Sequence, residues 1–373
     1  MTPDRPPVEP RGDLALMEGY HSPQLEVSVR LNTNESPFAP PAQFVERWLA
    51  ELRAAPLNRY PDRDARELRE ALGKHLGHPP ERVFCANGSN EVLQTLLLAY
   101  GGAGRKAVTF EPTYALHSHI ARITGTAVVV GTRAADFTID PDAACALIAE
   151  ARPTIVFACS PNNPTGTVEH PDTIDALLDA TGGLVVVDEA YGEFAPRSAL
   201  DLVRDDGRLV VARTYSKVWS MAALRLGFAV APPWVVAELE KVVLPYHLAV
   251  PTQVAGRVAL EWGDEMTDRV TRLVAERERV SAALDALEGV TAFPSGANFV
   301  LLHVRSGGRA AWDALVQRGV LVRDCSSWPG LADCLRVTIG TPEENDALLD
   351  ALPASIAASI GAPSAAPSEK EGA

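Results

Sequence analysis

The sequence has few lysines and lacks any long apolar run. Only five of its 34 Lys and Arg residues are lysines: Lys74, Lys106, Lys217, Lys241 and Lys370. No apolar stretch approaches the roughly 18 residues of a membrane-spanning helix. Residues 1–12 are rich in proline and charge, unlike the apolar core of a signal peptide. The sequence therefore predicts a soluble protein that stays inside the cell.

An excess of positive charge and a paired cysteine pattern are also missing. Asp and Glu outnumber Lys and Arg by 48 to 34, whereas a nucleic-acid-binding surface needs clustered basic residues. The five cysteines are odd in number and contain no Cys-x-x-Cys pair: Cys85, Cys145, Cys159, Cys325 and Cys334. We therefore expect a reduced, cytoplasmic protein with no metal site and with no nucleic-acid or membrane partner.

Short apolar runs alternate with helical patterns between residues 83 and 231. Hydrophobic residues make up 47% of the chain and charged residues 22%, which suits a globular protein with a large core. Leu184–Val187 and Leu209–Val211 are wholly apolar, as expected of strands covered on both faces. Strands that alternate with helices predict an α/β fold with a mainly parallel sheet.

The pattern changes after Pro251. Apolar residues at helical spacing from Val270 to Leu287 predict one long amphipathic helix, and short strand-like runs follow it. This mixture indicates a second, smaller α+β domain. We therefore expect an N-terminal arm (1–30), a small domain (31–54 and 251–355), a large domain (55–250) and a disordered tail (356–373) rich in Ala, Pro and Ser.

Polar clusters follow four of the apolar runs, at residues 86–91, 160–166, 188–191 and 214–217. Ligands collect at the carboxyl ends of strands in open α/β sheets, so we expect these clusters to meet at one sheet edge. Lys217 is the one lysine that stands at the end of an apolar run. Together the clusters indicate a ligand site built around this lysine.

Two of the clusters also have simpler interpretations. Ser89 or Asn90 fits a plain helix N-cap, and residues 162–166 fit a plain turn. Asp188 is harder to explain in this way, because it follows four apolar residues and a buried carboxylate is costly unless it is paired.

An anion site, a lysine amine and a buried carboxylate together suggest pyridoxal phosphate. Lys217 would bind this cofactor covalently, and Asp188 would pair with its pyridinium nitrogen. Arg225, Ser216 and the helix N-terminus at residues 88–90 would hold its phosphate, because free N–H groups and the helix dipole favour an anion there.

A series of short motifs carries a family resemblance over residues 31 to 352. In chain order they are LNTNESP (31–37), NRYP (58–61), NGSNE (87–91), EPTY (111–114), SPNNPTG (160–166), DEAY (188–191), RTYSK (213–217), LRLG (224–227), VRD (322–324) and CLRVTIG (334–340). With these motifs the sequence resembles the fold-type I pyridoxal-phosphate-dependent aminotransferases of class I/II, most closely their histidinol-phosphate aminotransferase branch. The resemblance implies a large domain with a seven-stranded, mainly parallel sheet flanked by helices.

The resemblance assigns roles around the cofactor. It implies that Lys217 is the covalent anchor and moves a proton between the substrate's α carbon and C4′ of the cofactor. It also implies that Asp188 keeps the pyridine nitrogen protonated and that Tyr114 stacks on the ring. The remaining implied contacts are to the phosphate (Ser89, Asn90, Thr214, Ser216, Arg225), to the phenolic oxygen (Asn163, Tyr191) and from a neighbouring subunit (Tyr60). A homodimer with shared active sites follows from the last contact.

The resemblance further implies an amino donor and a 2-oxo acid acceptor as small-molecule substrates. Arg336 would clamp the carboxylate of the amino-acid co-substrate, which suits a bidentate guanidinium. Arg323 and Tyr60 are candidates for the phosphate of the main substrate, and Asn34 is a further substrate-binding candidate. The implied reaction converts L-histidinol phosphate and 2-oxoglutarate to imidazole acetol phosphate and glutamate, a step of histidine biosynthesis.

The sequence departs from the family pattern at a few positions. Asn90 replaces the usual Asp of the phosphate loop, and His117 stands where a second aromatic residue is common. Small residues replace the usual glycines at Ala39, Ser220 and Ala223. These differences bear on the substrate more than on the cofactor.

Three other functions remain open at this point. The same scaffold serves aromatic or broad-range aminotransferases. Residues 323–331 resemble those of threonine-phosphate decarboxylase-like lyases, although residues 213–217 look more like the aminotransferase version. The scaffold also serves as a sensor domain in transcription regulators, but about 30 proline-rich N-terminal residues are too few for the DNA-binding domain that those proteins carry.

Overall fold

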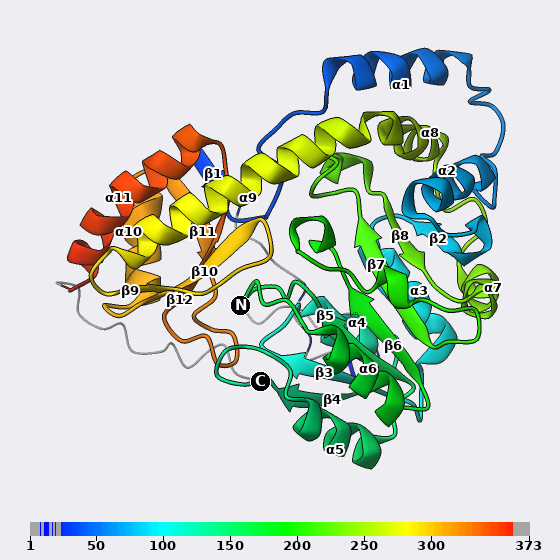
Figure 1. The fold of residues 1–373 in the computed structure, drawn as a ribbon, viewed down its shortest axis with the longest axis horizontal. Coiled ribbons are helices and arrows are strands. Elements are labelled where there is room, and N and C mark those ends of the chain that lie inside the picture. The colour runs from blue at the N-terminus through cyan, green and yellow to red at the C-terminus, as the bar shows by residue number, and fades with distance from the viewer. Residues whose placement is uncertain (1–7, 9–10, 15–16, 18, 20–23, 361–373) are drawn as a thin grey trace.

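Two β-sheets organise the chain in the computed structural model, which describes residues 8, 11–14, 17, 19 and 24–360 (Figure 1). The seven-stranded sheet has the order β2-β8-β7-β6-β5-β3-β4. Its pairs are parallel except those of β8, which runs antiparallel to β7 and β2. The predicted α/β class and mainly parallel sheet are confirmed. The strands are β2 (Val83–Ala86), β3 (Lys106–Glu111), β4 (Ala127–Thr132), β5 (Ile155–Cys159), β6 (Leu184–Asp188), β7 (Leu209–Thr214) and β8 (Gly227–Val230).

Helices bury both faces of this sheet. Successive residues of a strand point to opposite faces, so Val185 and Val187 join one core cluster and Val186 joins another. The first face is covered by α2 (Arg66–Leu76), α5 (Pro141–Ala151) and α6 (Pro171–Ala180). The second is covered by α3 (Ser89–Tyr100), α4 (Leu116–Ile123) and α7 (Pro233–Val242).

The five-stranded sheet lies in the C-terminal part of the fold, together with one strand from the N-terminal segment. Its order is β1-β11-β12-β10-β9, and β1 pairs in parallel with β11. Its strands are β1 (Val29–Leu31), β9 (Val290–Ala292), β10 (Phe299–Val304), β11 (Val320–Asp324) and β12 (Cys334–Thr338). Helices α10 (Gly308–Gln317) and α11 (Pro342–Ile360) pack with it.

A long helix, α9 (Gly263–Asp285), extends in Figure 1 from the five-stranded sheet to α8 (Val250–Ala259), on the side of the seven-stranded sheet. It follows α8, against which α1 (Ala42–Ala54) packs. The Trp48 indole of α1 donates a hydrogen bond to the carbonyl of Pro251 in α8, at 3.0 Å. Short 3-10 turns occur at Pro80–Arg82, Gly192–Phe194, Leu200–Leu202, Ala222–Leu224 and Leu260–Trp262.

The proposed domain boundaries remain a prediction. Strand β1 begins inside the segment predicted as an arm, and α11 extends to Ile360, inside the segment predicted as a tail. Residues 361–373 and much of residues 1–23 lie outside the described residues. Within the described chain, none of the helices is both long and apolar enough to cross a membrane.

Candidate active site

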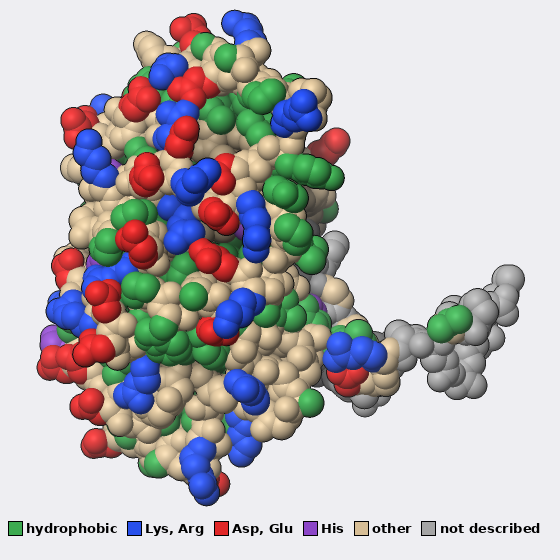
Figure 2. Space-filling model, turned by 90° about the vertical axis from the view of Figure 1, so that its right-hand side faces the viewer, with side chains coloured by type: hydrophobic (Ala, Val, Ile, Leu, Met, Phe, Trp, Pro, Cys, Tyr) green, Lys and Arg blue, Asp and Glu red, His purple; other side chains and the backbone are tan. Residues whose placement is uncertain are grey.

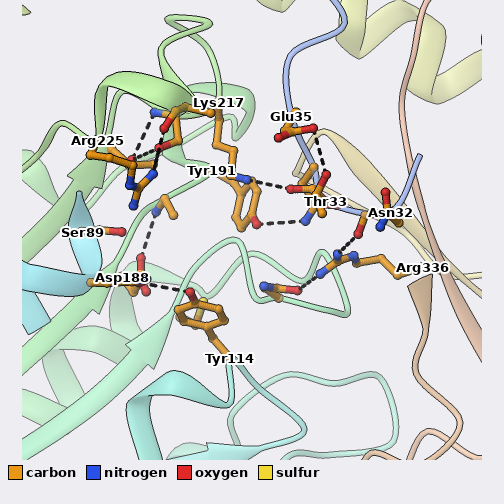
Figure 3. A pocket seen from close by; sticks show the side chains of 18 of the residues that line it. Asn32, Thr33, Glu35, Ser89, Tyr114, Asp188, Tyr191, Lys217, Arg225 and Arg336 are labelled. Atoms are coloured by element: carbon orange, nitrogen blue, oxygen red, sulfur yellow. Dashed lines mark hydrogen bonds between the residues drawn. The ribbon is translucent and has the colours of Figure 1, made fainter. Parts of the chain in front are cut away.

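The predicted polar clusters meet in one pocket of about 400 Å³ (Figure 3). It lies at the carboxyl ends of β2, β5, β6 and β7, where strands of the same direction finish at one sheet edge. Most of the residues predicted for the site line it: Asn34, Ser89, Asn90, Tyr114, Asn163, Asp188, Tyr191, Thr214, Ser216, Lys217, Arg225 and Arg336. Tyr60 and Arg323 are the predicted residues that do not.

The reversed direction of β8 explains how Arg225 reaches this edge. Gly227 at the start of β8 pairs with both Ala86 and Thr214, the last residues of β2 and β7. Arg225, just before Gly227, therefore lies beside the polar ends of the neighbouring strands. Its Nη1 donates to Ser216 Oγ at 3.2 Å.

A cradle for an anion forms where Arg225 meets the N-terminus of α3. The N-cap residue is Gly88, with φ at 80°, and no side chain caps the helix, so the N-cap interpretation of Ser89 or Asn90 is wrong. A Cβ on Gly88 would lie 2.5 Å from Arg225 Nη2, and one on Gly227 would lie 2.2 Å from the Ser89 nitrogen. The two glycines thus allow backbone N–H groups and a guanidinium to converge.

Asp188 sits at the base of the pocket with only 1% of its surface exposed. Its Oδ1 accepts from the backbone N–H of Ala190 at 3.1 Å, and its Oδ2 accepts from His117 Nε2 at 3.0 Å. His117 is equally buried and stacks on Phe157, with ring centroids 4.8 Å apart. The carboxylate is therefore paired, as a buried charge requires.

His117 is a contact of the site that the sequence did not reveal. It appeared there only as a departure from an aromatic pattern. Its place three residues after Tyr114, a residue predicted to contact the cofactor, was the available indication. Tyr114 itself donates through its hydroxyl to Asn90 Oδ1 at 3.1 Å, so the departure at Asn90 keeps a hydrogen-bond acceptor at this position.

The Lys217 amine has an unusually low proton affinity. Burial, followed by the positive charges of Arg336 and Arg225, lowers its pKa to about 7, although Glu35 acts in the opposite direction. The Nζ atom donates to the carbonyl of Thr33 at 3.0 Å. Because its pKa is about 7, about half of the molecules carry a neutral amine at pH 7, and a neutral amine can act as a nucleophile and as a base.

Tyr191 lies beside this amine. Lys217 Nζ is 5.6 Å from the Tyr191 ring centroid, and burial raises the pKa of the Tyr191 hydroxyl to about 12. Asn34 Nδ2 donates to the Tyr191 oxygen at 2.9 Å, and Asn34 Oδ1 accepts from Thr338 at 3.0 Å. The Asn34 amide, predicted to bind substrate, is thus engaged with protein groups at both of its ends.

Arg336 of β12 enters the pocket from the five-stranded sheet. Its Nη1 donates to Asn163 Oδ1 and its Nη2 to the carbonyl of Asn32 at 2.7 Å. Its buried Nε has no partner among the described residues, so a bound carboxylate would provide one.

The two predicted residues outside the pocket lie in different places. Arg323 of β11 is the cross-strand partner of Arg336, so the two side chains share a sheet face, and its guanidinium lies 5.7 Å from the Trp328 ring centroid. Tyr60 is 79% exposed and stacks on Tyr246 at 4.4 Å. The structure does not bring Tyr60 to the pocket of its own chain.

The pocket fits pyridoxal phosphate. The glycine-lined cradle supplies donors for a phosphate, and the buried Asp188 supplies a carboxylate for a ring nitrogen. The same pocket holds a lysine amine whose pKa is about 7. These three groups match the cofactor's phosphate, pyridine and carbonyl parts.

The fold and the site define a pyridoxal-phosphate-dependent enzyme of fold type I. Residues 26–352 match the family described as aminotransferase class I and II, and the chain belongs to that family. The predicted family, cofactor and aminotransferase activity are confirmed.

Curated relatives refine this placement. The chain is 45% identical to a histidinol-phosphate aminotransferase from Corynebacterium efficiens, over 91% of this chain and 93% of that one. It is 47% identical to one from Frankia casuarinae, over 92% and 89% of the two chains. Among solved structures, histidinol-phosphate aminotransferase from Sinorhizobium meliloti in complex with pyridoxal-5'-phosphate superposes with a TM-score of 0.82 at 25% identity, over 89% of this chain and 91% of that one.

Proposed function

We propose that the protein transfers the amino group of L-histidinol phosphate to 2-oxoglutarate, giving imidazole acetol phosphate and glutamate. The observation that carries this proposal is the 45–47% identity to histidinol-phosphate aminotransferases over about nine tenths of the chain. The family match over residues 26–352 includes every pocket residue. The reaction would serve histidine biosynthesis.

The pocket residues have proposed roles toward the cofactor. Bound pyridoxal phosphate supplies a carbonyl carbon that reacts with amines and a ring that withdraws electrons from the substrate's α carbon. The Arg225 cradle holds the phosphate, with Ser89, Asn90, Thr214 and Ser216 around it. Asp188 holds a proton at the pyridine nitrogen, because its buried carboxylate favours a positive partner.

The other contacts orient the ring and move the proton. Tyr114 lines the pocket as the stacking residue, and Asn163 and Tyr191 hydrogen-bond the phenolic oxygen. Lys217 is the covalent anchor and carries the proton between the α carbon and C4′. Its low pKa supports this role, because an amine can accept a proton at neutral pH only when it is partly deprotonated.

Arg336 of β12 and Arg323 of the adjacent strand β11 are proposed to bind different acidic groups of the substrates. Arg336, inside the pocket, binds the carboxylate of glutamate or 2-oxoglutarate. Arg323, on the same sheet face, binds the phosphate of histidinol phosphate. Because Arg323 stands outside the pocket, we assign it to the distal end of the longer substrate.

We further propose a homodimer in which Tyr60 completes the partner's site. Tyr60, Leu57, Leu244 and Tyr246 are exposed by 42% to 79%, and a surface hollow is lined by Tyr60 and Tyr246. Figure 2 shows hydrophobic side chains gathered between interspersed charges on the side of the molecule that lies to the right in Figure 1. A second copy would bury such a surface.

A cytoplasmic location is also proposed. All five cysteines are free thiols, and four of them are buried. Buried free thiols suit a reducing compartment.

A substrate panel tests the proposed reaction. The cofactor-loaded protein is mixed separately with L-histidinol phosphate, phenylalanine and threonine phosphate, and the absorbance follows conversion to the pyridoxamine form. Conversion by L-histidinol phosphate supports the proposal. Conversion by phenylalanine alone would indicate an aromatic aminotransferase, and release of CO2 from threonine phosphate would indicate a lyase.

A further inference from the structure

A buried hydrogen-bond chain ends at the hydroxyl of Tyr191. The backbone N–H of Asn34 donates to Thr338 Oγ1 at 2.9 Å, and the Thr338 hydroxyl is 3.0 Å from Asn34 Oδ1. Asn34 Nδ2 is in turn 2.9 Å from the Tyr191 oxygen. Asn34 is 1% exposed, Thr338 3% and Tyr191 5%, so these groups are largely shielded from bulk water.

The first member of the chain fixes the direction of the rest. A backbone N–H can only donate, so Thr338 Oγ1 accepts from it, and Oδ1 of Asn34 provides the acceptor for the Thr338 hydrogen. The Asn34 nitrogen then faces Tyr191 and donates to it. The reverse orientation of the amide would take away the acceptor of the Thr338 hydrogen in a buried place, which is costly.

The Tyr191 oxygen therefore accepts from Asn34 and keeps its own hydrogen for the pocket that it lines. We propose that Asn34 and Thr338 are positioning residues that hold the Tyr191 hydroxyl as a donor toward the phenolic oxygen of the cofactor. Asn34, predicted as a substrate contact, thus acts through Tyr191. The inference rests on the proposed cofactor contact of Tyr191 but not on the identity of the substrate.

This chain also joins separate parts of the fold. Thr338 is on β12, the strand that carries Arg336, whereas Tyr191 follows β6 of the seven-stranded sheet. The carbonyl of Asn34 accepts from Asn298 Nδ2 at 3.2 Å, next to β10. The five-stranded sheet, which carries Arg336, thereby holds the segment around Asn34. The side-chain amide of Asn34 in turn orients the Tyr191 hydroxyl.

Asn34→Asp tests the direction of the chain with little change of shape. A carboxylate can only accept, so Tyr191 would turn its hydrogen toward residue 34 and away from the cofactor. Withdrawing a donor leaves more negative charge on the phenolic oxygen and raises the proton affinity of the nitrogen conjugated with it. We expect the pH midpoint of the bound cofactor's absorbance change to rise by about one unit, a tenfold change in the proton equilibrium.

A double-mutant cycle separates this effect from the new negative charge. Tyr191→Phe removes the donor and should raise the midpoint by a similar amount. Asn34→Asp should then add little in the Tyr191→Phe background, because the two changes act through one hydroxyl. An Asn34→Asp shift that persists in full without the Tyr191 hydroxyl, or its absence in the wild-type background, would overturn the proposal.

Further variants test the role of Thr338 in the hydrogen-bond chain and the effect of a buried charge elsewhere in the protein. Thr338→Ser keeps the hydroxyl and should leave the midpoint unchanged, whereas Thr338→Val should raise it. Asn345→Asp is the matched control, because Asn345 is fully buried and bonded to Gly340 and Glu276 instead. It should lower stability without moving the midpoint; an equal shift in this control would contradict the assignment.

The measurement uses the cofactor-loaded protein without substrate. It can therefore disprove the role of Asn34 and Thr338 independently of the proposed reaction. If L-histidinol phosphate is not a substrate, the predicted midpoints still hold. If pyridoxal phosphate does not bind at all, both proposals fall.

Discussion

At the scale of single residues, the site depends on buried polar side chains and on the groups that they contact. Lys217 has a lowered pKa, and the carboxylate of Asp188 is paired with His117. The sequence identified Lys217 and Asp188 because each follows an apolar run, so burial could be inferred from neighbours in the chain. It did not identify His117 as the partner, because that contact joins α4 to β6 across the fold.

The pKa of Lys217 predicts how cofactor capture depends on pH. Only the neutral amine attacks a carbonyl, so in the cofactor-free protein capture should accelerate as pH rises through about 7 and then level off. Stopped-flow absorbance after mixing with pyridoxal phosphate measures this. A midpoint near the ordinary lysine value would contradict the account.

Lys217→Ala should lose the borohydride-reducible adduct, and an adduct remaining at another lysine would refute the assignment.

The contact between His117 and Asp188 predicts a loss of stability. His117→Phe keeps an aromatic ring on Phe157 but leaves Asp188 Oδ2 without its donor. We expect a cost of roughly 1–3 kcal/mol in the free energy of unfolding, together with weaker cofactor binding. Denaturant unfolding of the cofactor-free protein and a cofactor titration measure the two effects. Unchanged values in both would show that His117 is not the partner that matters.

At the scale of elements, the long periodic segments were predicted well. The helix expected over 270–287 is α9, and the short strand-like runs expected after it include β10, β11 and β12. Helices α7 and α8 were not predicted, although each has a proline in its first turn, where proline is common in helices. Strands β1 and β9 were also missed. Each has only three residues, too few for a local alternation of apolar and polar residues to indicate a strand. In addition, β1 pairs with β11, which is far away in the sequence.

The junction between β2 and α3 predicts a sharp effect of one methyl group. In Gly88→Ala the new Cβ would meet Arg225 Nη2 at 2.5 Å, and residue 88 would keep a positive φ. We expect at least a tenfold loss of cofactor affinity, measured by fluorescence titration. Gly77→Ala is the matched control, because Gly77 has φ at 72° with nothing within 4 Å of its Cβ position. Equal cofactor affinities in the two variants would contradict the cradle.

At the scale of the whole molecule, the sequence predicted the pocket better than its surroundings. The motif residues on β2, β5, β6 and β7 came together because parallel strands end at one edge. The place of Tyr60 could not be derived in this way. It lies outside its own chain's pocket, and only a second molecule can give it the proposed role.

The proposed dimer predicts the effect of a charge on the apolar surface. Leu244 is 75% exposed, so Leu244→Asp should fold but weaken association and lower activity, because Tyr60 would no longer reach the partner's site. Sedimentation velocity and activity are measured together. Val130→Asp is the control and should change neither association nor activity. Val130 lies on β4, the edge strand of the seven-stranded sheet opposite to β2. A Leu244→Asp protein that remains dimeric and fully active would contradict the proposed interface.

The most direct test of the central claim follows the amino group itself. The cofactor-loaded protein is incubated with 2-oxoglutarate and with L-histidinol phosphate whose amino nitrogen is isotopically labelled. The glutamate produced is analysed by mass spectrometry. The account predicts labelled glutamate and imidazole acetol phosphate in equal amounts, and neither product with Lys217→Ala. Absence of labelled glutamate from a protein that has bound its cofactor would contradict the account.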